Sequence, residues 1–381
     1  MTGHLTKKNQ LQAYKRVPPK IPEKVIVGYA NWHQCDEKIL EAVENGVNVL
    51  MWFSIDLTAD SITGKPLISR GPDLGCVAHM VQRIRKLNLI TIHFIAIGGW
   101  NSVHPDTRND ASTIYAEFDR WNREDVANPE LEWYGFDGFD WDLEGNDDIL
   151  HPNNEFTLEV LNVMGEMSVL GKKDGYLVSM APCESYLDFS TSNFSRSARL
   201  TNPEWQQLHP EFTYHSANVY SYVLVKFGLE NFDFVFLQFY ETFSHLLYKV
   251  LIENIKPADA LIKAIEDITT GWFVDFTTDD LTKDLSKVQL KIPFEKLIVG
   301  LGNFNYKSER SLYIPSEDCR FTYEHFLRLN GKSIRGFGFW DIADEGNILY
   351  KEKKLYLATE LNKFLKIRTV REEERNVFDE L

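Results

Sequence analysis

The sequence predicts an α/β fold in which eight parallel strands alternate with helices and close into a (β/α)8 barrel. Three observations support this prediction. Short runs of β-branched and aromatic residues recur along most of the chain, as buried strands do. These runs are apolar on both faces, which indicates a parallel sheet covered by helices. Between them, apolar residues recur at helical spacing. The combination is typical of a TIM barrel with loop insertions.

Eight runs fit buried strands. They lie at residues 25–29, 47–53, 89–97, 134–144, 176–180, 232–237, 297–301 and 336–339. The structural alternative is a doubly wound open sheet. That alternative is weaker because no G-x-G-x-x-G motif follows the first run, and because eight parallel strands close readily into a barrel.

The clearest helical pattern starts after Pro152-Asn153-Asn154 and carries apolar residues from Phe156 to Met167. A last helix is expected over 357–365, after the eighth strand. The spacing between strands is uneven, so we expect insertions at 56–72, 182–217 and 274–292. These insertions are expected to be loops or small subdomains, because no Gly/Ser-rich or Pro-rich linker divides the chain.

Three regions follow from this pattern. Residues 1–23 are polar and basic and carry three prolines, which predicts an extended N-terminal arm. Residues 24–366 are expected to form the barrel, and residues 367–381 a charged C-terminal tail.

The charge of the chain restricts its partners. With 381 residues and a formal net charge of -15, the protein is not expected to bind nucleic acid or anionic membranes, since both select basic surfaces. No run approaches the roughly 18 apolar residues of a membrane span. A neutral or weakly cationic substrate fits better, and no feature of the sequence indicates an oligomeric state.

Cysteines and termini bear on the compartment. Cys35, Cys76, Cys183 and Cys319 are widely spaced, so free thiols are expected, with one disulfide possible and no zinc site indicated. The N-terminus lacks the apolar segment of a secretory signal, which favours the cytoplasm. The last four residues, 378–381, weakly resemble the K-D-E-L retrieval signal, which instead favours the endoplasmic reticulum or secretion after processing.

The most informative segment is Asp137-Gly138-Phe139-Asp140-Trp141-Asp142-Leu143-Glu144. On a strand, alternation places Asp140, Asp142 and Glu144 on one face and the apolar residues between them on the other. Neighbouring carboxyl groups raise one another's pKa and titrate together. A solvated edge strand is the simpler interpretation, but its second face is too apolar for an edge.

Paired carboxyl groups are the requirement of glycosidic cleavage, in which one protonates the leaving oxygen and another stabilises the developing cation. Glu144 comes last on the strand and is the expected general acid. Asp142 is expected to share a proton with Asp140 and to keep Glu144 protonated near neutral pH. Asp137 has the opposite parity, which predicts a structural role.

Aromatic and polar residues gather where the predicted strands end, the edge at which barrels carry their chemistry. They are Tyr29, Asn31, Trp32, Trp52, Gly98-Gly99-Trp100-Asn101, Gln238-Phe239-Tyr240 and Trp340-Asp341. A single tryptophan at a strand end is usually core. Several around an acidic pair favour sugar binding, because aromatic faces stack on sugar rings while carboxylates and amides take the hydroxyls.

At these positions the chain resembles family 18 glycoside hydrolases, the chitinase family, in order from about residue 24 to 365. Residues 137–144 match the D-G-x-D-x-D-x-E signature at every defined position. Ile97-Gly98-Gly99 is similar to most of the S-x-G-G motif, and Met180-Ala181-Pro182 to the strand-five segment. Gln238-Phe239-Tyr240 resembles the Q-F-Y of the plant-type branch, and Trp340 the tryptophan of strand eight.

The resemblance implies a retaining hydrolase of β-1,4-linked N-acetylglucosamine, in chitin or chito-oligosaccharides, that uses the substrate's own acetamide as nucleophile. It implies that Glu144 is acid and then base, that Asp142 and Tyr240 hold the acetamide, and that Asp140 completes the catalytic group. It further implies two sets of residues. Substrate-binding positions are Tyr29, which also supports the aspartates, Gly99, Trp100, Met180, Gln238 and Trp340; structural positions are Asp137 and Gly138. No metal or organic cofactor is implied.

Two departures from the family pattern affect the neighbours of the acidic strand. Ala96 stands where the serine of S-x-G-G is expected, which removes a hydroxyl near the aspartates, and Glu241 follows Tyr240 where plant-type members often carry Asn. Two other functions stay open. One is an endo-β-N-acetylglucosaminidase acting on N-glycans; the other is a non-catalytic chitinase-like lectin or storage protein, which the presence of Glu144 disfavours.

Overall fold

The computed structural model describes residues 19–148, 150–198, 218–240, 244–303, 312–347, 349–350 and 352–367. The expected N-terminal arm and C-terminal tail therefore lie almost entirely outside the described residues. The same holds for Glu241 and for most of the insertion expected at 182–217.

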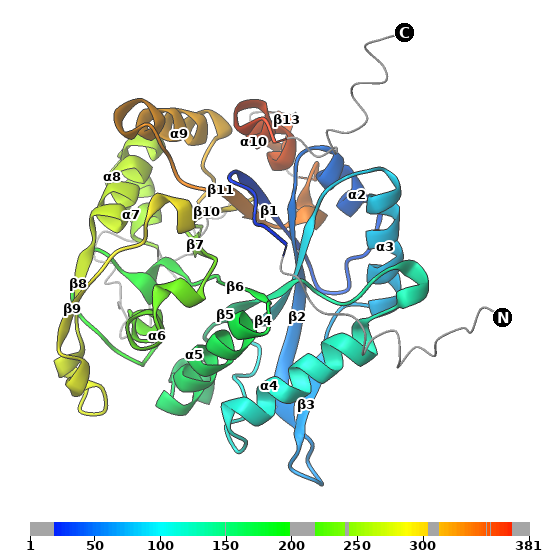
Figure 1. Ribbon diagram of the computed structural model, residues 1–381. Coiled ribbons are helices and arrows are strands. Elements are labelled where there is room, and N and C mark those ends of the chain that lie inside the picture. Colours follow the sequence, from blue (N-terminus) through cyan, green and yellow to red (C-terminus); the bar gives the residue numbers. More distant parts are fainter. Residues whose placement is uncertain are drawn as a thin grey trace.

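The predicted barrel is confirmed (Figure 1). Its strands are β1 (Val25–Ala30), β2 (Val49–Ala59), β4 (Ile92–Gly99), β5 (Gly138–Leu143), β6 (Leu177–Met180), β7 (Phe234–Gln238), β10 (Leu297–Gly302) and β11 (Gly336–Trp340). Each pairs in parallel with its neighbours, and β1 pairs with both β2 and β11, which closes the ring. All eight correspond to runs that the sequence predicts.

Helices surround this ring (Figure 1). They are α2 (Glu37–Glu44), α3 (Leu74–Lys86), α4 (Ala111–Arg120), α5 (Leu158–Lys173), α6 (Val219–Phe227), α7 (His245–Leu251), α8 (Pro257–Thr270), α9 (Ser316–Asn330) and α10 (Leu357–Leu365). Asp36, Asp73 and Asp110 each accept a hydrogen bond from a backbone N–H of the first turn that follows, which fixes where α2, α3 and α4 begin. No described helix is long and apolar enough to cross a bilayer.

Two of the expected insertions form hairpins. Strand β3 (Pro66–Arg70) pairs antiparallel with the extended end of β2, and β8 (Trp272–Asp275) pairs antiparallel with β9 (Lys287–Leu290). A short hairpin that the sequence did not predict joins β12 (Leu349–Tyr350) to β13 (Lys353–Lys354). Single-turn helices complete the described chain: η1 (Trp121–Val126), η2 (Pro129–Leu131), η3 (Pro152–Asn154), η4 (Glu184–Leu187), η5 (Leu229–Asn231), η6 (Phe276–Thr278), η7 (Lys283–Leu285), η8 (Phe294–Lys296) and η9 (Ile342–Asp344).

Apolar side chains pack in two separate clusters. The outer cluster fills the space between strands and helices and contains the apolar residues of β5, namely Phe139, Trp141 and Leu143. The inner cluster fills the barrel and includes Tyr29 and Phe53. The apolar face of β5 thus packs outward and its acidic face lies inside the barrel, as alternation predicts.

A disulfide joins Cys35 to Cys76, whose Cα atoms lie 6.2 Å apart. It ties the segment after β1 to the first turn of α3, although the two cysteines are 41 residues apart. The expectation of free thiols is therefore wrong for this pair, because the barrel brings successive strand ends together. Cys183 and Cys319 are buried and take part in no disulfide.

Candidate active site

The acidic face of β5 forms the centre of the site. Asp140, Asp142 and Glu144 are 0%, 3% and 6% exposed. In the sheet, Asp140 lies opposite Ala96 of β4 on one side and opposite Ser179 of β6 on the other. All three carboxyl groups are therefore shielded from water, which disfavours their ionised forms.

Two hydroxyl groups hold Asp140. The Ser179 hydroxyl donates to Oδ1 at 2.5 Å, and the Tyr29 hydroxyl donates to Oδ2 at 3.0 Å. Burial raises the pKa of Asp140 to about 6, and these two hydrogen bonds act against that rise. Tyr29 is 2% exposed and bonded to Asp140, so it supports this aspartate, as the sequence also suggests, and its contact with substrate stays a prediction.

A buried glutamine holds Asp142. The side-chain amide of Gln238 donates to Asp142 Oδ1 at 2.9 Å and to the Ala181 carbonyl at 2.6 Å. Gln238 is 2% exposed, so it orients Asp142 within the barrel. Proton sharing between Asp142 and Asp140 stays a prediction.

Glu144 lies directly after the end of β5. Burial raises the pKa of its carboxyl to about 7, while hydrogen bonds with Cys183, Asp142 and Gln238 act to lower it. The thiol of Cys183 donates to Glu144 Oε2 at 3.3 Å. A carboxyl with a pKa near neutrality holds its proton in the ground state and can release it in the transition state, as a general acid requires.

Glycines allow the close packing around the acidic strand. Gly98 and Gly99 have φ values of +107° and +106°, which disfavour any side chain. A Cβ atom at Gly99 would lie 2.3 Å from Phe53 Cζ, and one at Gly98 would lie 2.6 Å from the Asp142 carbonyl oxygen. Gly99 therefore shapes the site through its backbone.

The first residues of the acidic motif have structural contacts. Asp137 accepts a hydrogen bond from the backbone N–H of His93 at 2.9 Å, at the start of β4. A Cβ atom at Gly138 would lie 2.3 Å from the Leu177 carbonyl oxygen. Both residues make close contacts with neighbouring strands, and their structural role stays a prediction.

An aromatic cluster lies at the carboxyl ends of β1, β2 and β11. The ring of Phe53 lies 4.6 Å from the rings of both Trp32 and Trp340, measured between centroids, and Tyr29 lies 5.7 Å from Trp340. Trp32 is 36% exposed. Asn31 donates to Asp341 Oδ2 at 2.7 Å, which joins the segment after β1 to that after β11.

The aromatic cluster also contains Trp32 and Phe53, which lie outside the predicted substrate-binding set. The sequence places Trp32 at a strand end, but it shows Phe53 only as part of an apolar run. Its inward parity on β2, shared with Met51, is the signal that identifies it.

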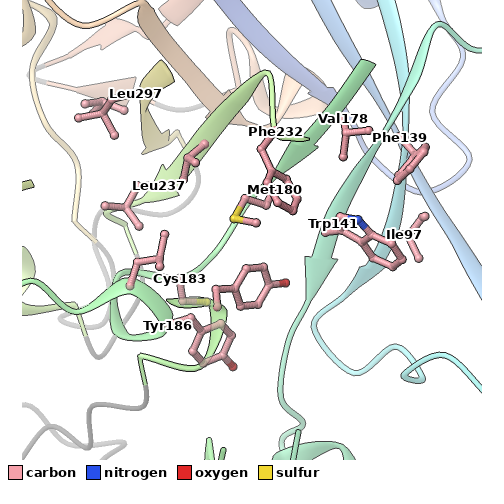
Figure 2. Close-up of a cluster of buried hydrophobic side chains, with 14 of the residues drawn as sticks. Ile97, Phe139, Trp141, Val178, Met180, Cys183, Tyr186, Phe232, Leu237 and Leu297 are labelled. Carbon is pink, nitrogen blue, oxygen red and sulfur yellow. The ribbon is translucent and has the colours of Figure 1, made fainter. Parts of the chain in front are cut away.

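The prediction that Met180 contacts substrate is wrong for its side chain. On β6, Leu177 lies in the inner cluster, whereas Val178 and Met180 lie in the outer one. Figure 2 shows Met180 among buried apolar side chains, near Val178 and Phe232. Alternation places Ser179, and not Met180, toward the acidic face.

Tyr240 and Trp100 lie near the acidic strand. Tyr240 is 6% exposed and belongs to the inner cluster, and its charge interaction with Tyr29 raises the pKa of Tyr29 after the larger effects of burial and the two aspartates. Trp100 donates through Nε1 to Asp147 at 2.9 Å, and its ring would lie 3.4 Å from a Cβ atom at Gly145, the residue after Glu144.

The replacement of serine by Ala96 has a structural counterpart. Ala96 is fully buried beside Asp140, where a serine hydroxyl would face the carboxylate from β4. Ser179 supplies a hydroxyl from β6, the strand on the other side. Asp140 therefore receives a serine hydrogen bond from β6 and not from β4.

The described residues contain no group of three or more His, Cys, Asp or Glu side chains arranged to hold a metal ion. The donors around the acidic face are hydroxyl, amide and thiol groups.

Comparison with known proteins places the fold. No family model matches the chain, and no curated protein matches its sequence. Among solved structures, a fungal endo-beta-N-acetylglucosaminidase from glycosyl hydrolase family 18 has a TM-score of 0.51 and 12% identity, covering 91% of this chain and 97% of that one. Chitinase ChiC from Aspergillus fumigatus has a TM-score of 0.50 and 12% identity, covering 87% and 95%. Similarity at this identity establishes a shared barrel fold.

Proposed function

We propose that the protein is a retaining glycoside hydrolase of the family 18 type, which cleaves β-1,4-linked N-acetylglucosamine in chitin or chito-oligosaccharides. The observation that carries this proposal is the buried Glu144, with a pKa of about 7, beside Asp142 on the inward face of β5. The D-G-x-D-x-D-x-E motif and the shared barrel fold support it.

In the first step, Glu144 donates its proton to the glycosidic oxygen as the bond from that oxygen to the anomeric carbon breaks. The carbonyl oxygen of the sugar's own acetamide bonds to the anomeric carbon and forms an oxazolinium ring. Asp142, held by Gln238, accepts a hydrogen bond from the acetamide N–H and stabilises the positive charge of the ring. The leaving sugar departs with a new hydroxyl group.

In the second step, the Glu144 carboxylate takes a proton from a water molecule, and the water oxygen bonds to the anomeric carbon. The oxazolinium ring opens, the acetamide is restored, and Glu144 is again protonated. Two displacements at the same carbon give net retention of configuration. Tyr240 is proposed to hydrogen-bond the acetamide carbonyl, as the plant-type Q-F-Y segment implies, and Asp140 with its two hydroxyl donors supports Asp142 from below.

Trp340 is proposed to lie beneath the reacting sugar. It is partly buried against the inner cluster, and its ring lies 5.7 Å from that of Tyr29, the residue that donates to Asp140. The exposed ring of Trp32 extends the aromatic surface beyond it. Flat aromatic faces suit the apolar faces of sugar rings, so this surface favours a substrate of several linked sugars.

A second candidate is an endo-β-N-acetylglucosaminidase that cuts within the core of N-glycans. The barrel of the fungal endo-beta-N-acetylglucosaminidase, with a TM-score of 0.51, is the observation that favours it. Both candidates use an N-acetylglucosamine at the site of cleavage, so the same acetamide chemistry serves either.

The test is to incubate the protein separately with chitotetraose and with a high-mannose glycopeptide, and to analyse products by mass. Cleavage of chitotetraose supports the first candidate, and cleavage of the glycopeptide alone supports the second. We expect Glu144→Gln to lower the rate by about a thousandfold or more, because it removes the proton donor, whereas Glu159→Gln, at an exposed position of α5, leaves it unchanged. Equal oligosaccharide binding by wild type and Glu144→Gln, with no cleavage by either, would favour a lectin.

A further inference from the structure

We propose that Cys183 is a positioning residue that holds the Glu144 carboxyl in place and stabilises its ionised form by donating a hydrogen bond from the thiol. The catalytic meaning of this contact rests on the function proposed above. The contact itself joins Cys183 Sγ to Glu144 Oε2 at 3.3 Å. Cys183 belongs neither to the acidic motif at 137–144 nor to the aromatic cluster described above.

The thiol has the setting that such a contact needs. Cys183 takes part in no disulfide and is 0% exposed, and Glu144 is 6% exposed, so little water competes for either group. A thiol is a weak donor to a neutral acceptor, but hydrogen bonds to an ionised carboxylate are stronger than those to neutral groups. The contact therefore favours the charged form of Glu144 over the protonated form.

The position of the thiol is fixed by backbone and packing. Cys183 forms an isolated parallel bridge with Gln238, and the Gln238 N–H donates to the Pro182 carbonyl at 3.0 Å. Its side chain belongs to the outer cluster, where Figure 2 shows it beside Tyr186. Gln238 thus has two roles: it orients Asp142, and it aligns the segment whose Cys183 contacts Glu144.

Other ionisable groups face Glu144 from the surrounding elements. Asp142 lies on the same strand and shares a hydrogen bond with Glu144, and Tyr220 on α6 interacts with the charges of both. His104, in the segment between β4 and α4, bonds to the Glu144 backbone carbonyl at 2.8 Å, and burial lowers the pKa of this histidine to about 4. His104 is therefore neutral near pH 7 and contacts only the backbone of Glu144. Cys183, in contrast, donates to the Glu144 carboxyl group.

The contact has a consequence for a residue that must act first as acid and then as base. Burial alone raises the Glu144 pKa, which keeps the carboxyl protonated before the first step but makes it a weaker proton donor, while the carboxylate left after that step is a strong base. Donation from Cys183 opposes burial and keeps the two forms of Glu144 close in free energy. It also fixes the carboxyl orientation in both steps.

A direct test is to titrate the Glu144 carboxyl by ¹³C NMR, in protein labelled at the glutamate side-chain carboxyl carbon. The signal is assigned by its loss in Glu144→Gln. We expect Cys183→Ala to move the Glu144 midpoint up by about half a pH unit to one unit, which is the weight of one hydrogen bond to a charged group. Cys183→Ser keeps a donor, so its midpoint should stay within a few tenths of the wild-type value or below it.

The matched control is Cys319→Ala, which removes the other free buried thiol, on α9. We expect no change in the Glu144 midpoint. Circular dichroism checks that each variant is folded. If Cys183→Ala fails to fold, Cys183→Val replaces it, because valine fills the space without a donor and should show the same upward shift. A Glu144 midpoint that is equal in wild type and in the donor-free variant would overturn the proposal.

A second arm uses the reaction. If chitotetraose or the glycopeptide is cleaved, the alkaline limb of kcat/KM should shift upward in Cys183→Ala by the same amount as the NMR midpoint, and return in Cys183→Ser. A purely structural role of Cys183 would change the rate without this shift. If the protein cleaves neither substrate, the proposed function fails while the NMR titration still decides the role of Cys183.

Discussion

At the scale of single residues, the acidic site depends on neutral hydrogen-bond donors. Asp140 accepts from Ser179 and Tyr29, Asp142 from Gln238, and Glu144 from Cys183. No lysine or arginine is among these donors. A neutral donor stabilises a carboxylate without the full charge of an ion pair, so the pKa values of Asp140 and Glu144 stay raised, near 6 and 7.

The donor to Asp140 can be moved between strands. We expect Ser179→Ala to lower kcat/KM about tenfold, because a hydrogen bond to a buried carboxylate is lost. Adding Ala96→Ser to this variant should restore most of the loss, since residue 96 lies opposite Asp140 on β4. Steady-state kinetics on the cleaved substrate measures both effects. If the double variant with Ala96→Ser and Ser179→Ala has no higher kcat/KM than Ser179→Ala alone, the two positions are not equivalent.

The burial of Glu144 should cost stability at neutral and alkaline pH. Its folded pKa of about 7 exceeds the ordinary 4.5, so the folded state binds more protons than the unfolded state between these values. Wild-type stability therefore falls as pH rises through that window. We expect Glu144→Gln to raise the free energy of unfolding relative to wild type by up to about 3 kcal/mol above pH 7, with little gain below about pH 4.

Urea unfolding of both proteins at about pH 4 and about pH 8 measures this difference. Glu166→Gln, at an exposed position in the middle of α5, is the control and should give the same small change at both values. A gain for Glu144→Gln that is equal at the two pH values would mean that the Glu144 pKa is not raised by folding.

At the scale of elements, side-chain contacts join the segments that follow different strands of the barrel. The segment after β1 carries Trp32 and is held by Asn31, which bonds to Asp341, and by the Cys35–Cys76 disulfide to α3. These contacts fix the exposed ring of Trp32 at the rim. The segment that carries Trp32 is thus attached both to the segment after β11 and to α3.

Loss of the disulfide should weaken both the fold and the rim. A bridge across 41 residues stabilises by up to about 4 kcal/mol in the chain-entropy estimate. We expect Cys35→Ala with Cys76→Ala to lower the urea midpoint, and to raise KM more than it lowers kcat, because Trp32, proposed to bind sugar, lies three residues from Cys35.

Peptide mapping without reductant checks the bridge itself. A linked Cys35–Cys76 peptide is expected, and Cys183 and Cys319 should react with an alkylating agent only after unfolding. Such a bridge is typical of oxidising compartments, so we propose that the protein functions in one. Four alkylated cysteines in the unfolded, unreduced protein would contradict the bridge.

At the scale of the whole molecule, the net charge of -15 is spread over a protein whose proposed substrate is neutral. Long-range fields steer charged ligands and have little effect on neutral ones. We expect kcat/KM on a neutral oligosaccharide to change less than about twofold between about 20 mM and about 500 mM salt. The deacetylated, cationic analogue should instead bind more weakly as salt rises. A strong salt dependence with the neutral substrate would point to a charged one.

Most of the fold was predictable because each strand carries its own signal. Eight apolar runs with helices between them leave few alternatives to a closed barrel, and the alternation in 137–144 assigns each acid to a face. The motif at 180–182 does not reveal the direction of the Met180 side chain, which alternation along β6 directs to the outer cluster. Cys35–Cys76 and the donors Ser179 and Cys183 were not predictable, since each depends on which neighbouring strands meet and how far their side chains reach.

The hydroxyl that reaches Asp140 from β6 has a consequence for how relatives of this chain are recognised. Residues 96 and 179 lie opposite Asp140 on its two neighbouring strands, so a hydroxyl at either position can face the same carboxyl group. A sequence comparison that treats these two positions as a pair would therefore detect such a donor, whereas a comparison made position by position would miss it.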